Sequence, residues 1–344
     1  MNKKEIQQLL KTSDYDFLRK NKQLGDNIIL LVVGGSHAYG LDTPTSDVDI
    51  RGVFMNDPRE ILGLESTDRI EDSATDTVLY SLPRFLELCC DCNPNIIEII
   101  GVEEDSILYA SPLGRKLLEH KHLFITKKAA KSFSGYAEAQ MRRLTNALNG
   151  KEVSYDKKLE YMHQSVKRQR EAFIHKFQEI DKDSKLDIKI AEGKDGKKDI
   201  LLDINLTNYP LRDFSEIING MRLVVKDYDS LGKRNSKKDT LHINKHAMHL
   251  IRLYKMGIEI LRDNSINVKR IHDREELLNI RNGCYMDETG HYSPGFDEYV
   301  DRLSAELNDA KNNSDLPEKV NVSEVNALLY KLNLDYLSAQ KRLF

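Results

Sequence analysis

Six apolar residues, Ile28 to Val33, run directly into two glycines, Gly34 and Gly35, and this junction constrains the fold more than any other part of the chain. A short apolar run that ends at glycine is typical of a buried strand. Because glycine has no Cβ, a turn at this point lets backbone N–H groups approach an anion closely, and Ser36 adds a hydroxyl donor. The sequence therefore predicts a core strand that ends in a phosphate-binding turn.

Two carboxylates follow this turn, Asp47 and Asp49, and they alternate with the apolar residues Val48 and Ile50. If residues 47–54 form the next strand, its two-residue period places both carboxylates on one face. Neighbouring carboxylate oxygens suit Mg²⁺, which typically takes one or two carboxylates together with substrate phosphates. Each feature alone is common, so the prediction of a metal and phosphate site depends on their order.

The chain resembles the nucleotidyltransferase superfamily of DNA polymerase β, and within it the RNA-ligase-associated branch. The segments that carry the resemblance are GGSHAYG (34–40), SDVDIRGV (46–53), DTVLYSLPRFLEL (76–88), NPNIIE (93–98), KHAMHLIRLYKMGIEIL (245–261) and RNGCYMDE from Arg281. They occur in the order of the family and cover most of the chain outside about residues 150–235.

The resemblance implies an enzyme that moves a nucleoside monophosphate from a bound nucleoside triphosphate, such as ATP, to an acceptor hydroxyl and expels pyrophosphate. It implies Mg²⁺, or Mn²⁺ in its place, held by Asp47, Asp49 and Asp76, which are also the expected catalytic residues. The residues expected to bind the nucleotide are Gly34, Gly35, Ser36, Ser46, Lys245 and Arg252.

The third carboxylate is the least certain member of this set when only the residues are considered. Asp76 directly precedes an alternating segment that predicts a strand, and in this superfamily an acid in that setting deprotonates or orients the attacking hydroxyl. Glu71 and Asp72 are competing candidates nearby, and Glu98 is a more distant one. The resemblance favours Asp76.

The acceptor of the nucleotide is left open by the residues. The branch implies an RNA 3′ end in RNA repair or processing. Residues 126–176 carry 12 basic against 5 acidic side chains, whereas residues 1–125 carry 13 against 21. A basic helical segment fits contact with a polyphosphate or nucleic-acid backbone, although surface helices are often charged without such a role. The alternatives are a small-molecule or protein hydroxyl as acceptor, and a catalytically silent nucleotide- or RNA-binding protein of the same fold.

The fold class expected is α+β, with two domains in 344 residues. Residues 1–125 are expected to form a mixed-sheet nucleotidyltransferase lobe, and residues 126–344 a mainly helical domain with a β-hairpin at about 183–206. The elements expected in the first domain are helices at 5–20 and 83–92 and strands at 28–33, 47–54, 76–81 and 96–101.

From Thr126 the apolar period changes from two to 3.6 residues, which indicates helices. Expected helices cover 126–147, a segment from Ser154, 242–262, 294–311 and 322–341, with a polar loop at 232–239. In the helix 242–262, the angular positions of Lys245, His249 and Arg252 oppose the apolar stripe. These three basic residues are therefore expected to face solvent or an interdomain cleft.

The cysteines and the termini bear on the cellular compartment. Cys89, Cys90, Cys92 and Cys284 do not form a secreted disulfide framework in a chain of this length, and they lack zinc spacing, so buried thiols are expected. The start of the chain has no apolar leader, and no apolar run approaches 18 residues. We therefore expect a cytoplasmic protein without membrane association.

Overall fold

The computed structural model describes residues 1–148, 155–178, 185–193, 196–207, 209–229, 240–287 and 292–340. The chain forms two compact units. Unit 1 comprises Met1–Phe133, Met256–Leu278 and Asn313–Phe344, and unit 2 comprises Ser134–Lys255 and Asn279–Asn312. These bounds differ from the border expected at residue 125, because two later segments of the chain join the N-terminal unit.

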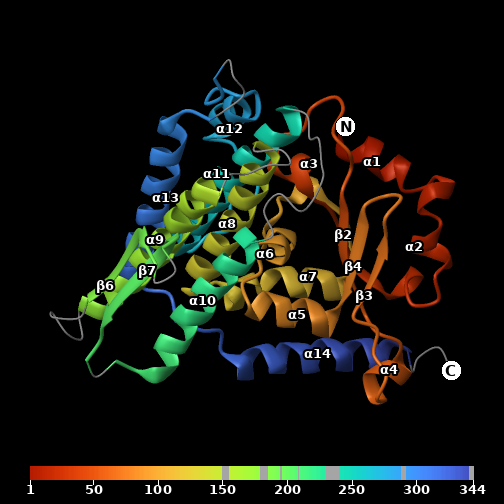
Figure 1. The fold of residues 1–344 in the computed structure, drawn as a ribbon. Coiled ribbons are helices and arrows are strands. Elements are labelled where there is room, and N and C mark those ends of the chain that lie inside the picture. Colours follow the sequence, from red (N-terminus) through yellow and green to blue (C-terminus); the bar gives the residue numbers. More distant parts are fainter. Residues whose placement is uncertain are drawn as a thin grey trace. The chain divides into compact units, whose positions relative to one another are not determined.

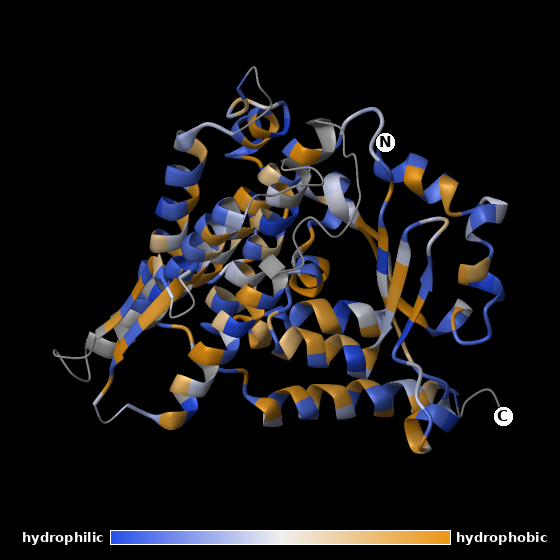
Figure 2. Ribbon diagram, viewed as in Figure 1, coloured by the Kyte–Doolittle hydropathy of each residue, from blue (hydrophilic) through white to orange (hydrophobic). Residues whose placement is uncertain are grey.

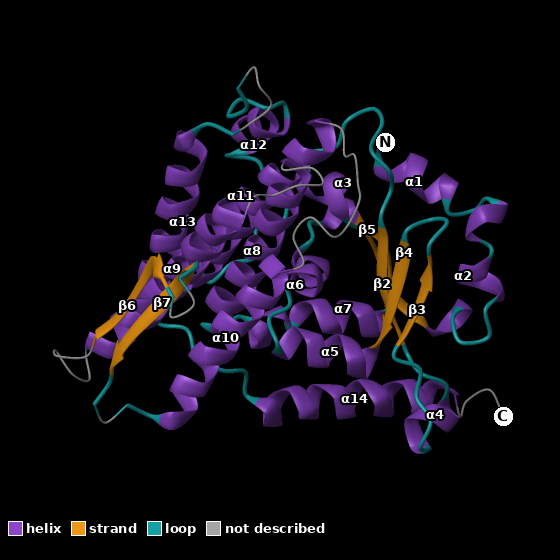
Figure 3. Ribbon diagram, in the orientation of Figure 1, coloured by secondary structure: helices purple, strands orange, loops and turns teal. Residues whose placement is uncertain are grey.

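Unit 1 is built on a five-stranded mixed sheet, as expected from the sequence (Figure 3). Its strands are β1 (Ile28–Val33), β2 (Ile50–Phe54), β3 (Arg69–Asp72), β4 (Thr77–Ser81) and β5 (Ile107–Ala110), in the order β3-β4-β2-β1-β5. β2 pairs with β4 in parallel, and the other neighbours are antiparallel. β1 is buried along its whole length, which confirms the core strand.

Helices cover both faces of this sheet (Figure 1). The helices of unit 1 are α1 (Lys3–Leu9), α2 (Phe17–Lys20), α3 (Gly35–Tyr39), α4 (Pro58–Leu62), α5 (Leu82–Cys90), α6 (Pro94–Gly101), α7 (Pro112–Glu119) and α14 (Val322–Gln340), with 3-10 turns at Ser13–Tyr15, Gly25–Asn27, Glu104–Ser106 and Lys121–Phe124. α1 and α2 pack on one face, where Ile6 and Leu18 join a buried cluster with Ile50 and Phe54. α5 and α7 lie on the other face with their apolar residues inward, and α14 packs against both (Figure 2).

The expected strand at 96–101 is wrong, because these residues belong to helix α6. The Asn93 side chain caps the helix by accepting from the backbone N–H of Asn95, and Pro94 occupies the first turn, where its missing N–H costs nothing. The apolar side chains that follow are buried on nearly every side of the helix. A helix buried all round has no polar stripe, so its sequence imitates a buried strand.

Three other expected elements differ in extent. The helix expected at 5–20 is divided into α1, a 3-10 turn and α2. The strand expected at 47–54 begins only at Ile50, so Asp47 and Asp49 lie in the segment before it. The helix expected from Thr126 is α8 (Lys128–Leu148). Ser154, Asp195 and the loop 232–239 lie outside the described residues.

Unit 2 is mainly helical and contains the expected hairpin. Its described elements are α9 (Tyr155–Gln178), β6 (Lys185–Glu192), β7 (Lys198–Asn205) and α10 (Leu211–Asp229), with parts of α8, α11 (Thr240–Asp263), α12 (Arg274–Arg281) and α13 (Pro294–Asn313). β6 and β7 are antiparallel, and Leu186, Ile188 and Ile200 pack in a cluster with apolar residues of α9 and α10. Among the described residues, no helix combines the length and apolar character that a membrane crossing requires.

The cysteines agree with the expectation in part. All four are free, and Cys89 and Cys92 are buried, but Cys284 is exposed. Burial raises the pKa of the Cys92 thiol to about 12. At neutral pH this thiol is therefore protonated and inert.

Candidate active site

The glycine turn after β1 makes room for a carboxylate of the protein itself. Gly35 has a φ of +58°, and a Cβ at this position would lie 1.7 Å from Oδ2 of Asp49. The backbone N–H of Gly34 donates to the Asp49 carbonyl oxygen at 2.8 Å. Glycine is therefore required for two reasons, the left-handed backbone and the close approach of the carboxylate. The anion beside this turn in the structure is Asp49.

The two serines expected at the site have different surroundings. Ser36 is buried in the first turn of α3, a five-residue helix. Ser46 stabilises the loop before β2, since its Oγ accepts from the backbone N–H of Thr43 at 2.9 Å. The local role of Ser46 is thus to fix the loop that carries Asp47, and its contact with a nucleotide stays a prediction.

Arg51 joins the two carboxylates that the sequence places 27 residues apart. One of its amino groups lies 3.3 Å from Oδ1 of Asp49 and 3.1 Å from Oδ1 of Asp76. The other donates to the Asp76 carbonyl oxygen and, at 3.0 Å, to that of Ile50. Because β2 and β4 are parallel neighbours, the residues at their starts are brought to the same edge of the sheet. Sequence reasoning missed Arg51, although it follows Asp49 by two residues and so shares its face.

Asp76 is the acid that the fold connects to Asp49. It has a φ of 45° immediately before β4, a conformation that non-glycine residues adopt rarely. The competing candidates lie on the edge strand β3, where Glu71 pairs with Arg69 and Asp72 accepts from Thr75. The arrangement favours Asp76 over both, and its catalytic role stays a prediction.

The carboxylates offer oxygen ligands of the kind that Mg²⁺ prefers. Asp47 is exposed in the loop before β2, and Asp49 is half-buried beside Gly35. Among the described residues, no group of three or more histidine, cysteine, aspartate or glutamate side chains is close enough to hold a metal. Between Asp49 and Asp76 lies instead the guanidinium of Arg51. Asp47 and Asp49 supply oxygen atoms of the kind a divalent cation takes, and a metal held by Asp47, Asp49 and Asp76 stays a prediction.

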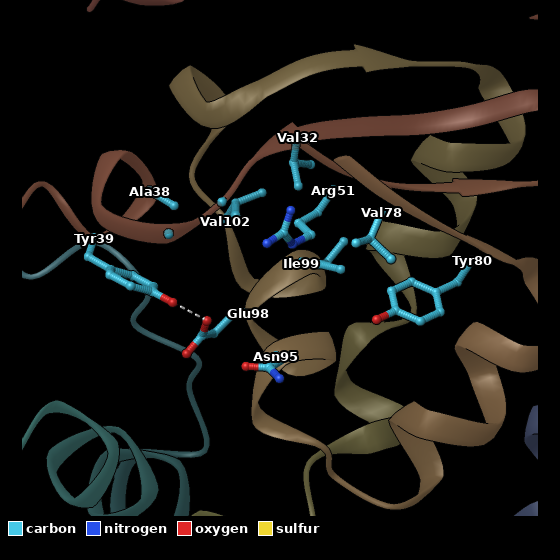
Figure 4. A pocket seen from close by; sticks show the side chains of 12 residues that line it. Val32, Ala38, Tyr39, Arg51, Val78, Tyr80, Asn95, Glu98, Ile99 and Val102 are labelled. Atoms are coloured by element: carbon cyan, nitrogen blue, oxygen red, sulfur yellow. Dashed lines mark hydrogen bonds between the residues drawn. The ribbon is translucent and has the colours of Figure 1, made fainter. Parts of the chain in front are cut away.

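A pocket of about 210 Å³ lies in unit 1 beside the turn and Arg51 (Figure 4). We call it the Glu98 pocket, and its lining residues are Val32, Gly34, Gly35, Ala38, Tyr39, Arg51, Val78, Tyr80, Asn95, Glu98, Ile99 and Val102. The side chains of Arg51, Tyr80 and Glu98 project toward one space from β2, β4 and α6. The Tyr39 hydroxyl donates to Oε2 of Glu98 at 2.5 Å, and Glu98 is only 8% exposed. Glu98 is the most distant of the alternative acids named from the sequence, and it lies on α6, where a strand was expected.

The segment Met256–Leu278, which belongs to unit 1, supports two walls of this pocket. The backbone N–H of Arg270 donates to the Tyr39 carbonyl oxygen at 2.9 Å, at the end of α3. Gly101, at the end of α6, packs so closely on Ile266 that a Cβ would lie 2.2 Å from its side chain. Arg270 itself is fixed by Glu259 and Asp273, with four hydrogen bonds of 2.6–3.0 Å. No motif indicated this support, because it depends on residues far apart in the chain.

The basic residues expected to oppose the site lie on α11, within unit 2. Lys245 is exposed, but Arg252 is only 4% exposed, so these residues do not share one solvent-exposed face, and the alternative of an interdomain cleft stays a prediction. The apolar residues of α11 are buried around most of its circumference, including Met248, Leu253 and Met256. Desolvation, reinforced by Arg252 and Lys245, lowers the pKa of His249 well below its usual value.

Comparison with known proteins adds evidence at the level of the family. Residues 5–189, more than half of the chain, match the family model described as RlaP, RNA repair pathway DNA polymerase beta family. A protein of Enterobacteria phage T4, described as an uncharacterized 38.9 kDa protein in the nrdC-mobD intergenic region, is 26% identical over 119 residues. That match covers 31% of this chain and 35% of the phage protein, so it spans about a third of its relative. No solved structure matches the chain.

Proposed function

The chain belongs to the RNA repair pathway DNA polymerase beta family, and from this premise we propose that it is a metal-dependent nucleotidyltransferase that adds a nucleoside monophosphate to an RNA 3′ end. The family supports nucleotidyl transfer and a connection with RNA repair. The metal, the donor and the acceptor are the parts that we propose. The observation that carries the proposal is the placement of Asp49 and Asp76 at one sheet edge, beside the glycine turn.

Each residue of this edge has a role in the proposed reaction. Asp47 and Asp49 are the ligands for Mg²⁺, which would supply neutralising charge for the triphosphate and the leaving pyrophosphate. The backbone at Gly35 and Ser36 is proposed to contact the β and γ phosphates. Asp76 is proposed to accept or orient the proton of the acceptor hydroxyl, so that its oxygen attacks the α-phosphorus in line.

Basic residues of unit 2 are the second part of the proposal. Lys245 and Arg252 are proposed to contact the triphosphate or the acceptor backbone. Lys245 is the stronger candidate, because it is exposed whereas Arg252 is buried. If Lys245→Ala leaves the KM for both the nucleotide and the acceptor unchanged, this role is excluded for Lys245.

Incorporation of label tests the reaction directly. Each α-labelled nucleoside triphosphate is incubated with Mg²⁺, the protein and an RNA that ends in a free 3′ hydroxyl, or the same RNA with a blocked 3′ end. We expect label only on the free end, loss of label with a chelator, and at least about a thousandfold loss with Asp49→Asn, since removal of a preorganised charge in an active site has effects of this size. Asp68→Asn, an exposed aspartate of the same unit, is the matched control. Near-normal incorporation of label by Asp49→Asn would contradict the proposal.

Salt dependence separates an RNA acceptor from a small one. Binding of RNA releases counterions, so its affinity falls steeply on a log–log plot against salt concentration. A small neutral acceptor lacks that slope. A flat slope together with label on a protein or small-molecule hydroxyl would favour the corresponding alternative acceptor.

One observation favours a catalytically silent binding protein as the second candidate. Arg51 already pairs with Asp49 and Asp76, and these carboxylates form no preassembled metal cluster within the described residues. A silent protein would bind nucleotides or RNA without incorporating label under any metal. The same assay, repeated with Mn²⁺, therefore distinguishes the two candidates.

A further inference from the structure

We infer that the Glu98 pocket binds the base of the nucleotide, and that Glu98 selects bases with an exocyclic amino group. This inference rests on the proposed nucleotidyl transfer and specifies its substrate. It concerns residues of unit 1 alone.

The lining of the pocket suits a flat ring with polar edges. Apolar side chains of Val32, Val78, Ile99 and Val102 supply surfaces that a ring can cover, as ligand pockets usually do. Polar groups at separate points, including the Asn95 amide and the Tyr80 hydroxyl, are placed to meet the edges of a ring. A volume of about 210 Å³ gives a single ring system room.

The charge of the lining disfavours a polyphosphate in the pocket. Arg51 and Glu98 are the two charged residues of the lining set, and the single charge of Arg51 is shared with Asp49 and Asp76. A triphosphate carries several negative charges, which the Glu98 carboxylate would repel. A neutral base avoids this repulsion.

The position of the pocket connects it with the proposed chemistry. Arg51 lines the pocket and also contacts Asp49 and Asp76. Gly34 and Gly35 belong both to the lining and to the proposed phosphate turn. The pocket therefore adjoins the residues that are proposed to bind the phosphates and the metal.

Glu98 provides the selectivity. An ionised carboxylate only accepts hydrogen bonds. Adenine and cytosine present amino groups, and guanine presents a ring N–H beside an amino group, whereas uracil presents one N–H between two carbonyl oxygens. Those carbonyl oxygens would face the carboxylate and repel it. The hydrogen bond from Tyr39 holds the Glu98 carboxylate in one orientation. The carboxylate is therefore already oriented when a base binds.

Affinity for the four nucleoside triphosphates tests this inference without an acceptor. Calorimetry in the presence of Mg²⁺ measures the Kd of ATP, GTP, CTP and UTP for the wild type and for Glu98→Gln. We expect UTP to bind about tenfold more weakly than the strongest of the other three, since hydrogen bonds to a charged group have this magnitude. Glu98→Gln should remove most of this difference, because its amide can still accept from Tyr39 but can also donate to a uracil oxygen. Glu103→Gln, at an exposed glutamate outside the pocket, is the matched control.

A second variant keeps the inference testable if Glu98→Gln does not fold. Val102→Phe fills the pocket without changing its polar groups and should weaken all four nucleotides by about tenfold or more. Circular dichroism and the Tm identify variants that have lost the fold. A purely structural hydrogen bond between Tyr39 and Glu98 would lower the Tm of Glu98→Gln and leave the ratio of the four affinities unchanged.

The outcomes separate this inference from the function on which it rests. Equal binding of all four nucleotides by the wild type, or an unchanged ratio in Glu98→Gln, overturns the base pocket while label incorporation still stands. Undiminished binding by Val102→Phe has the same meaning. If the wild type binds none of the four nucleotides, both the base pocket and nucleotidyl transfer are wrong.

Discussion

Arg51 and Arg270 each lie between two carboxylates in unit 1, and their surroundings differ sharply. Arg270 is 4% exposed and makes four hydrogen bonds of 2.6–3.0 Å to Glu259 and Asp273. Arg51 is 25% exposed and lies 3.1–3.3 Å from its two carboxylates, one of which, Asp76, is 60% exposed. The guanidinium of the first cluster is buried, although Glu259 beside it is 25% exposed, whereas the guanidinium of the second is open to water. We call the two arrangements the closed cluster and the open cluster.

The closed cluster suits a structural role. Burial acts to lower the pKa of Arg270, but the hydrogen bonds that it donates to Glu259 and Asp273 outweigh this effect, so the pKa is raised. Its charge is therefore permanent throughout the physiological pH range. The backbone beside it holds the end of α3, and thereby one wall of the Glu98 pocket. The open cluster has weaker, longer contacts that a substrate can replace.

Removal of the closed cluster's cation has the largest expected effect. Arg270→Met leaves two carboxylates without their partner in a buried site, which typically costs about 3–5 kcal/mol. We expect the free energy of unfolding to fall by this amount, measured by urea denaturation. Lys269→Met is the control, because Lys269 pairs with Asp105 at the surface and such pairs contribute under about 1 kcal/mol. Equal losses in the two variants would contradict the distinction between closed and open clusters.

The glycine turn tests how tightly the open cluster is built. Gly35→Ala combines a positive φ with a Cβ only 1.7 Å from the Asp49 carboxylate, so we expect it to cost about 2–3 kcal/mol and to displace Asp49. Gly40→Ala is a matched control, since Gly40 has a φ of +68° but its nearest foreign atom lies 3.7 Å from the added Cβ. Its expected cost is about 1–2 kcal/mol, from the backbone alone. The difference between the two unfolding free energies measures the carboxylate contact, and no difference would show that the contact is absent.

The His249 imidazole extends the comparison with the two arginines, because its charged neighbours are basic residues instead of carboxylates. Desolvation, then Arg252, Lys245, His246 and Arg281, lower its pKa well below 6.5. The unfolded chain therefore binds a proton that the folded chain does not, and stability falls as the pH drops below about 6.5, by at most about 1.4 kcal/mol per pH unit. His249→Gln should show a shallower slope between pH 7.5 and 5.5 in urea denaturation. Equal slopes would mean that His249 is not held neutral.

The sequence predicted the parts of the fold that depend on local pattern. The strand β1, the hairpin β6-β7 and the long helices α11, α13 and α14 follow from clear periodicity and clear ends. The strand expected at 96–101 failed, because burial of α6 on nearly every side removes the pattern that separates helix from strand. The edge strand β3 was missed, since its four residues, RIED, are mostly polar.

The candidate site shows the same limit. The turn and its two carboxylates are local in sequence, so their proximity could be predicted. The contact of Arg51 with Asp76 depends on the parallel pairing of β2 with β4, and the support of α3 by Arg270 depends on a segment 230 residues further along the chain. Neither pairing has a signal in one sequence. Glu98 likewise lines the pocket from the helix α6, where the sequence predicted a strand.

Replacement of Arg51 has the smallest expected effect on stability, and it is the change that most sharply separates the two arginines. Arg51→Gln removes a guanidinium that is 25% exposed and lies 3.1–3.3 Å from its two carboxylates, so the free energy of unfolding should change by under about 1 kcal/mol. Incorporation of label should nevertheless fall by about tenfold or more, because Asp76 loses the contact that holds it beside Asp49 and a poorly positioned catalytic group costs rates of this size. Arg51→Lys keeps the charge but cannot reach both carboxylates and the Asp76 carbonyl oxygen at once, so it should restore little of the rate. A large loss of stability with unchanged incorporation would instead show that Arg51, like Arg270, has a structural role.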